Sequence, residues 1–433
     1  MRGASPGHLV RLVLTTLVAA ASGDAAQTLG TALTAEEAVR LALVQSPAVT
    51  AARSRLEAAS AGVRGARTPF NPQGEVAPGV GFTNGNALLS QQFDIGARRA
   101  AQTRAATGVR AAAQAELDLA RLQAAAGARA AYYDLVRARA VEAAASDAAV
   151  LARQIRDAVR RRVEIGEAPM VQATRADIEV ARAEQDVTRA QGEVRGRLAA
   201  LNLLLGRPAE ALLTPSEALA VPETPAGTAD LVEQAQRRRP ELSVVRGLIE
   251  ARRGDVAVAR AQRRPELFAE LAADGWSLDR NPFHSRNLGF QARLSFPLFD
   301  QGRLRAGVDQ ARAGVREQEA ELAATSQMLG IEIQRAAAEL AAAREVALNY
   351  QTAILPRTQD LLRATRAGFD IGLASFLEVL EAQRLARLTQ TEYLNTLFEA
   401  MRARIALDRA LGAIPGLAPT APGPSDPGRS PRR

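Results

Sequence analysis

The sequence predicts a mainly α-helical protein that carries two β-hairpins and is built as a tandem repeat. Short motifs recur at a constant offset of 206 residues, as when Phe93-Asp94-Ile95-Gly96 returns as Phe299-Asp300-Gln301-Gly302. Residues 97–163 and 303–369 lack Gly–Pro turn clusters apart from Pro356, so each indicates a helix too long for a compact domain. An aromatic-rich, alternating stretch precedes each long segment. The repeated unit is therefore helix, hairpin, long helix, tight glycine turn and helix.

Composition excludes several classes of protein. The 433-residue chain has no cysteine and only two histidines, so a disulfide framework, a thiolate metal site and a His-rich metal site are not expected. The net charge of +8 comes from arginines scattered among acidic residues, with no concentrated basic patch, which argues against nucleic-acid binding. No catalytic triad or phosphate-binding loop is present, so neither an enzyme activity nor a cofactor is expected.

The N-terminus has the pattern of an export signal. Arg2 and Arg11 precede an apolar stretch at 12–21, and small residues follow as far as Ala26. The stretch is shorter than the roughly 20 residues that span a bilayer. Residues 1–26 are therefore predicted to be a signal peptide, and the alternative is a buried N-terminal helix.

The first structural repeat is expected at 27–206. Its opening helix begins after Thr34, a plausible N-cap, and Pro47 interrupts it early. A hairpin follows at about 74–93, and a long helical hairpin at about 97–205 completes the unit.

The second structural repeat is expected at 229–412, after a Pro-containing connector at 207–228. Its hairpin lies at about 266–299 and its long helical hairpin at about 303–411. Residues 413–433 are rich in Pro, Gly and Ser, and this composition predicts a disordered tail.

The second hairpin carries the strongest strand signal in the chain, because apolar and polar residues alternate with strict period two. Eight of the eleven Phe residues and the single Trp fall within 70–93 and 268–299. One face in contact with lipid and the other with a polar lumen fits this pattern, and the alternative is a sheet packed on a soluble core. The expected lipid-facing residues are Leu288, Phe290, Ala292, Leu294, Phe296 and Leu298.

Strands exposed to lipid must close into a barrel, because open edges leave backbone groups unpaired in hydrocarbon. Two hairpins give four strands per chain, too few for closure, so a barrel must be shared between subunits. Two chains would supply eight strands and three would supply twelve, and the pattern itself does not choose.

Each long helix is expected to reach about 100 Å at roughly 1.5 Å per residue. Pro356 predicts a kink or local break in the second one. Both long helices stop at an Ile-Gly pair, Ile165-Gly166 and Ile371-Gly372, where glycine suits a left-handed C-cap that reverses the chain.

The tandem unit, the passage Ser295 to Arg303 and the passage Phe369 to Ala382 together resemble the TolC family of outer membrane efflux proteins. The resemblance covers about 34–412, and the passage 89–99 is similar to the cobalt–zinc–cadmium resistance branch. The resemblance implies a homotrimer with a shared 12-stranded β-barrel in the outer membrane and a long periplasmic α-helical barrel. It also implies docking to a periplasmic adaptor protein and to an inner-membrane transporter of the resistance–nodulation–division type.

The resemblance also assigns residues to sites. Glu378, Glu381 and Phe369 match the periplasmic constriction, where two rings of carboxylates in a trimer would favour cations. The alternative for the two acidic residues is an ordinary solvated helix face. The positions that match the adaptor-docking tips are Ile165, Gly166, Glu167, Ala168, Ile371, Gly372, Leu373 and Ala374.

The implied function is the outer membrane channel of a tripartite efflux system, which passively conducts heavy-metal cations or drugs. An exit duct of a type I protein secretion system keeps the same fold. An alternative of another class is a soluble periplasmic coiled-coil scaffold, against which the period-two stripe Leu288 to Leu298 argues.

Overall fold

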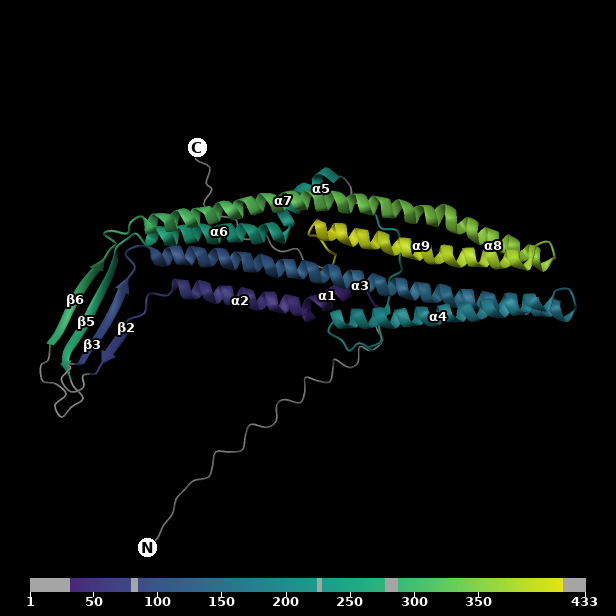
Figure 1. Ribbon diagram of the computed structural model, residues 1–433, viewed down its shortest axis with the longest axis horizontal. Helices are drawn as coiled ribbons and strands as arrows, with labels where there is room; N and C mark the ends of the chain where they lie inside the picture. The colour runs from purple at the N-terminus through teal and green to yellow at the C-terminus, as the bar shows by residue number, and fades with distance from the viewer. Residues whose placement is uncertain (1–31, 79–84, 224–227, 277–286, 416–433) are drawn as a thin grey trace, which may run out of the picture.

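The computed structural model describes residues 32–78, 85–223, 228–276 and 287–415 of the chain. The molecule is elongated, with a β-sheet at one end and two helix-reversing turns at the other (Figure 1). The predicted signal peptide at 1–26 lies outside the described residues.

The predicted order of elements is confirmed in both halves. The first half contains β1 (Ala32–Leu33), α1 (Ala35–Gln45), α2 (Pro47–Arg67), β2 (Gln73–Ala77), β3 (Gly85–Phe93), α3 (Arg98–Glu164), α4 (Met170–Leu204) and β4 (Thr214–Pro215). The second half contains α5 (Thr228–Arg238), α6 (Pro240–Ala261), β5 (Glu266–Trp276), β6 (Asn287–Ser295), α7 (Arg303–Asn349), η1 (Tyr350–Ile354), α8 (Leu355–Asp370) and α9 (Phe376–Ala410).

Local sequence explains where the short helices start. Thr34 Oγ1 accepts a hydrogen bond from the N–H of Glu37 (3.2 Å), and Glu37 Oε2 accepts one from the N–H of Thr34 (2.9 Å). This reciprocal capping box fixes the start of α1. Pro47 and Pro240 each occupy the first position of the next helix, because proline there gives up an N–H that has no helical partner.

The second long helix is interrupted where Pro356 predicted a break. A five-residue π-helical segment, η1, precedes Leu355, whose N–H reaches the carbonyl of Tyr350. Proline lacks an N–H and its ring crowds the preceding turn, so the wider turn accommodates it. The equivalent stretch of α3 is continuous α-helix.

Four helices form a single layer between the sheet and the middle of the molecule, in the order α2, α3, α6, α7. Glycines allow α3 and α6 to approach closely. A Cβ built on Gly254 would lie 2.3 Å from Ala105 Cα, and one built on Gly108 would lie 2.2 Å from the nitrogen of Ala251. Any side chain at these glycines would therefore push the two helices apart.

The middle of the molecule contains the largest buried cluster, and the connector between the two repeats packs against it. The 207–228 connector includes β4, which pairs in parallel with β1. Tyr132 donates a hydrogen bond to Leu33 O (2.9 Å) and accepts one from the N–H of Ser216 (3.2 Å), which ties the connector to α3. Ile414, two residues past the predicted end of the second repeat, is only 3% exposed and belongs to this cluster.

Candidate functional site: the four-stranded sheet and the helical tip

The four longer strands form one antiparallel sheet in the order β2-β3-β5-β6. The two hairpins therefore lie side by side, joined through β3 and β5. Among the described residues of the single chain, β2 and β6 each have one strand partner and form the two open edges of the sheet.

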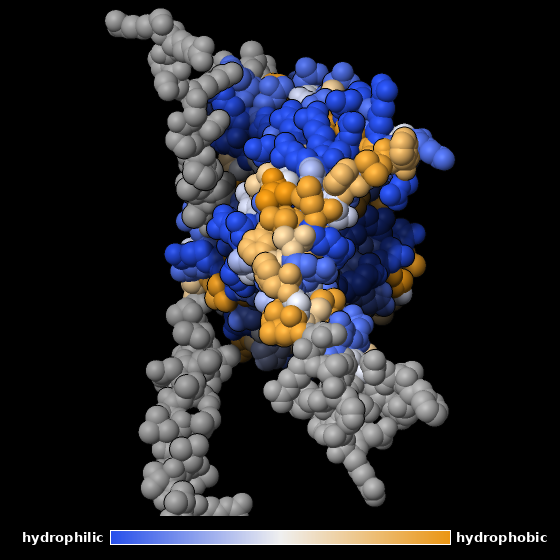
Figure 2. Space-filling view, turned by 90° about the vertical axis from the view of Figure 1, so that its left-hand side faces the viewer, coloured by the Kyte–Doolittle hydropathy of each residue, from blue (hydrophilic) through white to orange (hydrophobic). Residues whose placement is uncertain are grey.

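The strand register brings apolar residues of all four strands to one face of the sheet. This apolar face is exposed: Leu288 is 73% and Phe290 76% accessible. Figure 2 shows a column of hydrophobic side chains at the sheet end, bordered by hydrophilic surface. The apolar members are Val76, Ala87, Leu89, Phe93, Leu267, Ala269, Leu271, Ala273, Leu288, Phe290, Ala292 and Leu294.

The opposite face is polar, with Glu270 at its centre. Its carboxylate accepts hydrogen bonds from Gln291 Nε2 (2.7 Å), Arg293 Nε (2.9 Å) and Ser90 Oγ (3.4 Å), and Glu270 is 4% exposed. The Arg293 guanidinium also stacks over the ring of Phe268 at 4.5 Å. A buried carboxylate with three donors is well compensated, so this face holds an organised polar network.

The predicted lipid-facing strand is too long at its C-terminal end. Strand β6 ends at Ser295, so Phe296 and Leu298 lie beyond it. Pro297 between them has no N–H and cannot continue a ladder, which explains the stop. Both side chains remain exposed, at 51% and 74%.

The repeated Phe-Asp-x-Gly motif marks the junction from sheet to helix. The carboxylate of Asp94 accepts hydrogen bonds from the N–H groups of Arg98 (2.8 Å) and Arg99 (3.0 Å). Asp300 does the same for Leu304 (2.9 Å), and this bond holds the pKa of Asp300 below its usual range. Each aspartate caps a long helix, which explains why the motif occurs in both halves.

Both tip turns have the same backbone geometry. Gly166 (φ 78°) and Gly372 (φ 80°) occupy the left-handed region that was predicted. The N–H of Glu167 donates to Arg162 O (2.8 Å) and that of Leu373 to Gly368 O (2.8 Å), the six-to-one bond of a Schellman motif. The motif therefore satisfies the last carbonyls of both long helices.

The tip turns present apolar side chains to solvent. Ile165 is 68%, Ile371 71% and Leu373 83% exposed. Three large apolar side chains are therefore gathered at the end of the rod, where no other part of the described chain covers them. Glu167 is exposed beside them, whereas Ala168 and Ala374 are half-buried.

Phe369, which was predicted for the constriction, is buried within the single chain. It is 5% exposed and packs against Phe376, with ring centroids 6.4 Å apart. Arg162, at the end of α3, stacks over its ring at 4.2 Å and donates hydrogen bonds to Phe369 O and to Asp370 O (3.1 Å for the latter). Phe369 and Arg162 together tie the α8–α9 hairpin to the α3–α4 hairpin.

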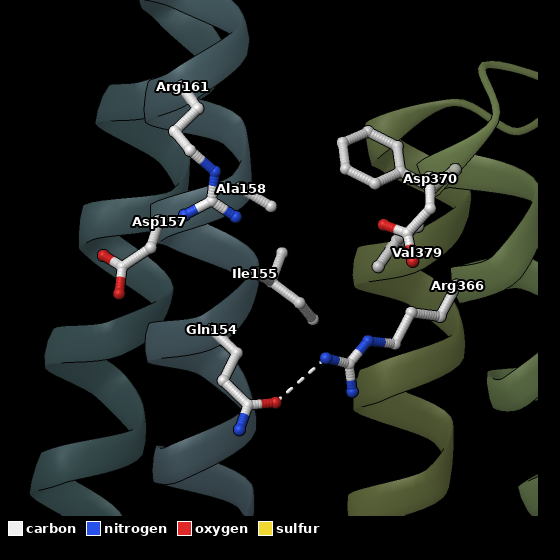
Figure 3. A pocket seen from close by; sticks show the side chains of 9 residues that line it. Gln154, Ile155, Asp157, Ala158, Arg161, Arg366, Asp370 and Val379 are labelled. Atoms are coloured by element: carbon white, nitrogen blue, oxygen red, sulfur yellow. Dashed lines mark hydrogen bonds between the residues drawn. The ribbon is translucent and has the colours of Figure 1, made fainter.

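A groove of about 500 Å³ separates the two helical hairpins near the tip (Figure 3). Arg366 from α8 donates a hydrogen bond to Gln154 Oε1 from α3 (2.9 Å) across it. Nearer the middle of the molecule, Arg387 of α9 contacts Asp186 of α4 (2.5 Å), and Arg384 pairs with Glu179. Polar bonds and apolar packing therefore both hold the hairpins together. The groove is lined by Gln154, Ile155, Asp157, Ala158, Arg161, Arg366, Phe369, Asp370 and Val379.

The two predicted constriction carboxylates differ in environment. Glu378 accepts a hydrogen bond from the N–H of Ser375 (2.6 Å) while Ser375 Oγ accepts one from the N–H of Glu378 (3.3 Å). This capping box lowers the pKa of Glu378, and the Ser-x-x-Glu spacing that signals it is visible in the sequence. Glu381 is exposed one turn further along α9, and its carboxylate interacts electrostatically with Arg384.

Within the described residues, no helix combines the length and the apolar character needed to cross a membrane. Across the same part of the chain, no three His, Cys, Asp or Glu side chains are grouped so that they could hold a metal ion.

Comparison with known proteins defines the class. A sequence model of the outer membrane efflux protein family matches residues 38–207 and 231–413, one segment in each half. The chain therefore belongs to the outer membrane efflux protein family, whose members are channel proteins.

Particular relatives agree with this family. The chain is 26% identical over 389 residues to the cobalt-zinc-cadmium resistance protein CzcC of Cupriavidus metallidurans, covering 88% of this chain and 90% of that one. It is 28% identical over 265 residues to the pyoverdine export outer membrane protein OpmQ of Pseudomonas aeruginosa, covering 59% and 54%. The solved structure of CusC shares the fold, with a TM-score of 0.73 and 21% identity, covering 88% of this chain and 92% of that one. The structure of VceC from Vibrio cholerae also has a TM-score of 0.73, with 23% identity, covering 88% of this chain and 96% of that one.

Family membership fixes location and general role. The protein is an outer membrane efflux channel, located in the outer membrane and extending into the periplasm. A soluble coiled-coil scaffold is thereby excluded.

Proposed function

We propose that three copies of this chain form one conduit, in which a shared 12-stranded barrel continues into a periplasmic α-helical barrel. The observation that supports it is the sheet: one apolar face, one polar face and two open edges. Since the four strands alternate in direction, β6 of one copy meets β2 of the next as an antiparallel pair. Closure removes both edges, which hydrocarbon does not tolerate.

The lumen that a conduit needs favours three copies over two. With strands about 4.8 Å apart and tilted by about 40°, eight strands give a backbone diameter of roughly 16 Å, which side chains fill. Twelve strands give roughly 24 Å by the same estimate and leave an aqueous channel. The polar face around Glu270 and Arg293 would line it.

The test of assembly is the mass of the particle extracted from the outer membrane fraction. A detergent-dependent particle close to three times the chain mass is expected. A particle of two chains would contradict the 12-stranded barrel, and a detergent-independent monomer would contradict any shared barrel.

The exposed tip turns are proposed to dock a periplasmic adaptor protein, which in turn links the channel to an inner-membrane transporter of the resistance–nodulation–division type. Ile165, Ile371 and Leu373 supply the apolar contact. A photoreactive residue at position 373 should crosslink to an adaptor in the native cell envelope, and Ile371→Asp should abolish the crosslink. Crosslinking only to lipid or to other copies of this chain would refute docking at the tip.

The conducted substrates are proposed to be cations, with divalent heavy metals as the first class to test. Glu378 and Glu381 support a cation preference, because carboxylate rings attract cations and repel anions. The relative CzcC is described as a cobalt-zinc-cadmium resistance protein and matches this chain along most of its length. The channel would do no chemistry and would need no cofactor, since the inner-membrane partner supplies the energy.

Reversal potentials in planar bilayers test the cation preference. The double substitution Glu378→Gln, Glu381→Gln should reduce it, and each single substitution should reduce it in part, because the lowered pKa of Glu378 keeps that carboxylate charged as well. Unchanged reversal potentials would refute the role. Growth of a deletion strain in zinc, cobalt and cadmium, with and without the gene restored, tests the metal class, and a defect only with organic toxicants would contradict it.

A further inference from the structure

Arginines that are scattered along the sequence gather at the sheet end of the helical layer. They come from the last turns of α2 and α6 and the first two turns of α3 and α7. Each lies within about 9 Å of its helix end along the axis, at roughly 1.5 Å per residue. All are exposed. We call this set the arginine collar: Arg64, Arg67, Arg104, Arg260 and Arg305.

The collar residues have no salt bridge and no side-chain hydrogen bond among the described residues. Two neighbouring arginines of the same region do find partners. Arg98 pairs with Glu266 (2.5 Å), and Arg264 donates to Gly96 O (3.0 Å). The collar therefore presents positive charge that the described part of this chain does not neutralise.

The contacts of α3 show to which side of the layer Arg104 points. Arg98 pairs with Glu266, which the register places on the polar face of the sheet. Arg104 lies six residues later, about 240° further around the helix, and so points to the apolar side of the molecule. Gly108 of α3 faces α6, and Thr103 donates a hydrogen bond to Ala66 O of α2 (3.1 Å), so these two helices lie on opposite sides of α3. Arg104 points between those directions, and neither α2 nor α6 covers it.

Helices α6 and α7 carry their collar residues on the same side. Arg253 of α6 donates to Glu319 of α7 (3.1 Å), which fixes one shared face. Arg260 follows Arg253 by two turns, and Arg305 precedes Glu319 by about four turns, so both lie on that face. Helices α3 and α7 run away from the sheet and α6 runs toward it. Because all three helices are right-handed, the face shared by α6 and α7 is also the side of the layer that bears Arg104.

We propose that the arginine collar binds the phosphate headgroups of anionic phospholipids in the periplasmic leaflet of the outer membrane. The inference rests on the proposed barrel, whose apolar face would sit in the hydrocarbon directly beside the collar. Guanidinium groups bind phosphate oxygens in a bidentate manner, and their aliphatic stems lie along apolar surface while the charge reaches the headgroups. An anionic leaflet attracts each such arginine, which orients the channel and fixes its depth.

A second copy of this chain is a poorer occupant of the collar. Every copy would carry the same positive charges at the same height, so contact between two collars would be repulsive. The phosphates of the leaflet supply the opposite charge along the whole ring.

The test compares two triple variants of equal charge change in the full-length channel. The collar variant is Arg104→Gln, Arg260→Gln, Arg305→Gln. The control variant replaces three exposed arginines of the helical body that also form no salt bridge within the described residues, Arg195→Gln, Arg316→Gln, Arg357→Gln. Native mass spectrometry in neutral detergent measures bound phosphatidylglycerol against phosphatidylcholine, and reports the number of chains per particle in the same spectrum.

The wild type and the control variant should bind phosphatidylglycerol selectively, and the collar variant should bind it on the order of 100-fold more weakly at low salt. Equal loss in both variants, no loss in the collar variant, no selectivity in the wild type, or displacement of the lipid by equimolar inorganic phosphate would each overturn the proposal. A spectrum without three-chain particles would instead contradict the proposed assembly, whatever the lipid binding.

Discussion

Removal of the Arg162 side chain should loosen the tip. This guanidinium links the end of α3 to the end of α8 through two backbone carbonyls and through the ring of Phe369 at 4.2 Å. In this half-buried setting two charge-assisted hydrogen bonds and a cation–π contact together contribute about 2 kcal/mol. Arg162→Ala should therefore shift the ratio of separated to associated hairpins by roughly 30-fold.

Single-channel recording in planar bilayers measures this shift, provided that the tip hairpins form the narrowest part of the proposed conduit. Arg162→Ala should raise the odds of the high-conductance state by about the same factor of 30. Because the chain has no cysteine, Gln154→Cys and Arg366→Cys can be introduced as a unique pair across the groove. A bifunctional thiol reagent that joins them should return Arg162→Ala to the low-conductance state.

The matched control is Arg160→Ala, which breaks a bond to Asp177 (2.8 Å) inside the α3–α4 hairpin and, as far as the described residues extend, none between hairpins. It should leave the conductance unchanged, since exposed pairs contribute little. If Arg162→Ala behaves like this control while keeping its assembly, the link through Arg162 does not hold the tip.

Three further predictions concern the layer, the tip and the sheet. Gly254→Leu should lower the free energy of unfolding by about 3 kcal/mol in urea because its side chain meets the backbone of α3, whereas Gly192→Ala, with no atom within 4 Å of the new Cβ, should raise it by up to about 1 kcal/mol. The lowered pKa of Glu378 means that its capping of α9 is fully present above about pH 4.5 and is lost as the pH falls through the lowered value; normalised hydrogen-exchange protection of the first turn of α9 should show this, and Glu378→Gln should remove the dependence. Phe290→Arg should make the free energy of folding into lipid vesicles less favourable by about 2–4 kcal/mol, while Gln291→Arg on the polar face should change it little. Equal effects of the two substitutions would refute the assignment of faces.

Local chemistry in the sequence was sufficient for the secondary structure. The offset of 206 residues showed that both halves contain the same order of elements. The Ile-Gly pairs and Pro356 act on backbone groups within a few residues, so their effects on the helices could be inferred directly. The error at the end of β6 was also local: the alternation of apolar residues continued through Phe296 and Leu298, but Pro297 could not join the ladder.

The candidate sites depended on contacts between distant segments. Phe369 was assigned to a constriction from its place in the sequence, and only packing against Phe376 and Arg162 shows that it is buried. Glu378 was predicted from the same passage, yet its capping bond to Ser375 could have been found from the Ser-x-x-Glu spacing.

The sequence by itself determined the repeat, the order and length of the helices, the alternation of the second hairpin and the positions of the chain reversals. These properties follow from periodicity and backbone chemistry that act over one or two turns. Tertiary structure alone decided that β3 pairs with β5, that Arg162 joins the two tip hairpins, and that the helix ends bearing five exposed arginines lie at the sheet end of one layer. The physical reason is that these groups are separated by tens to hundreds of residues, so only the packing of the helical layer and the register of the sheet bring them together.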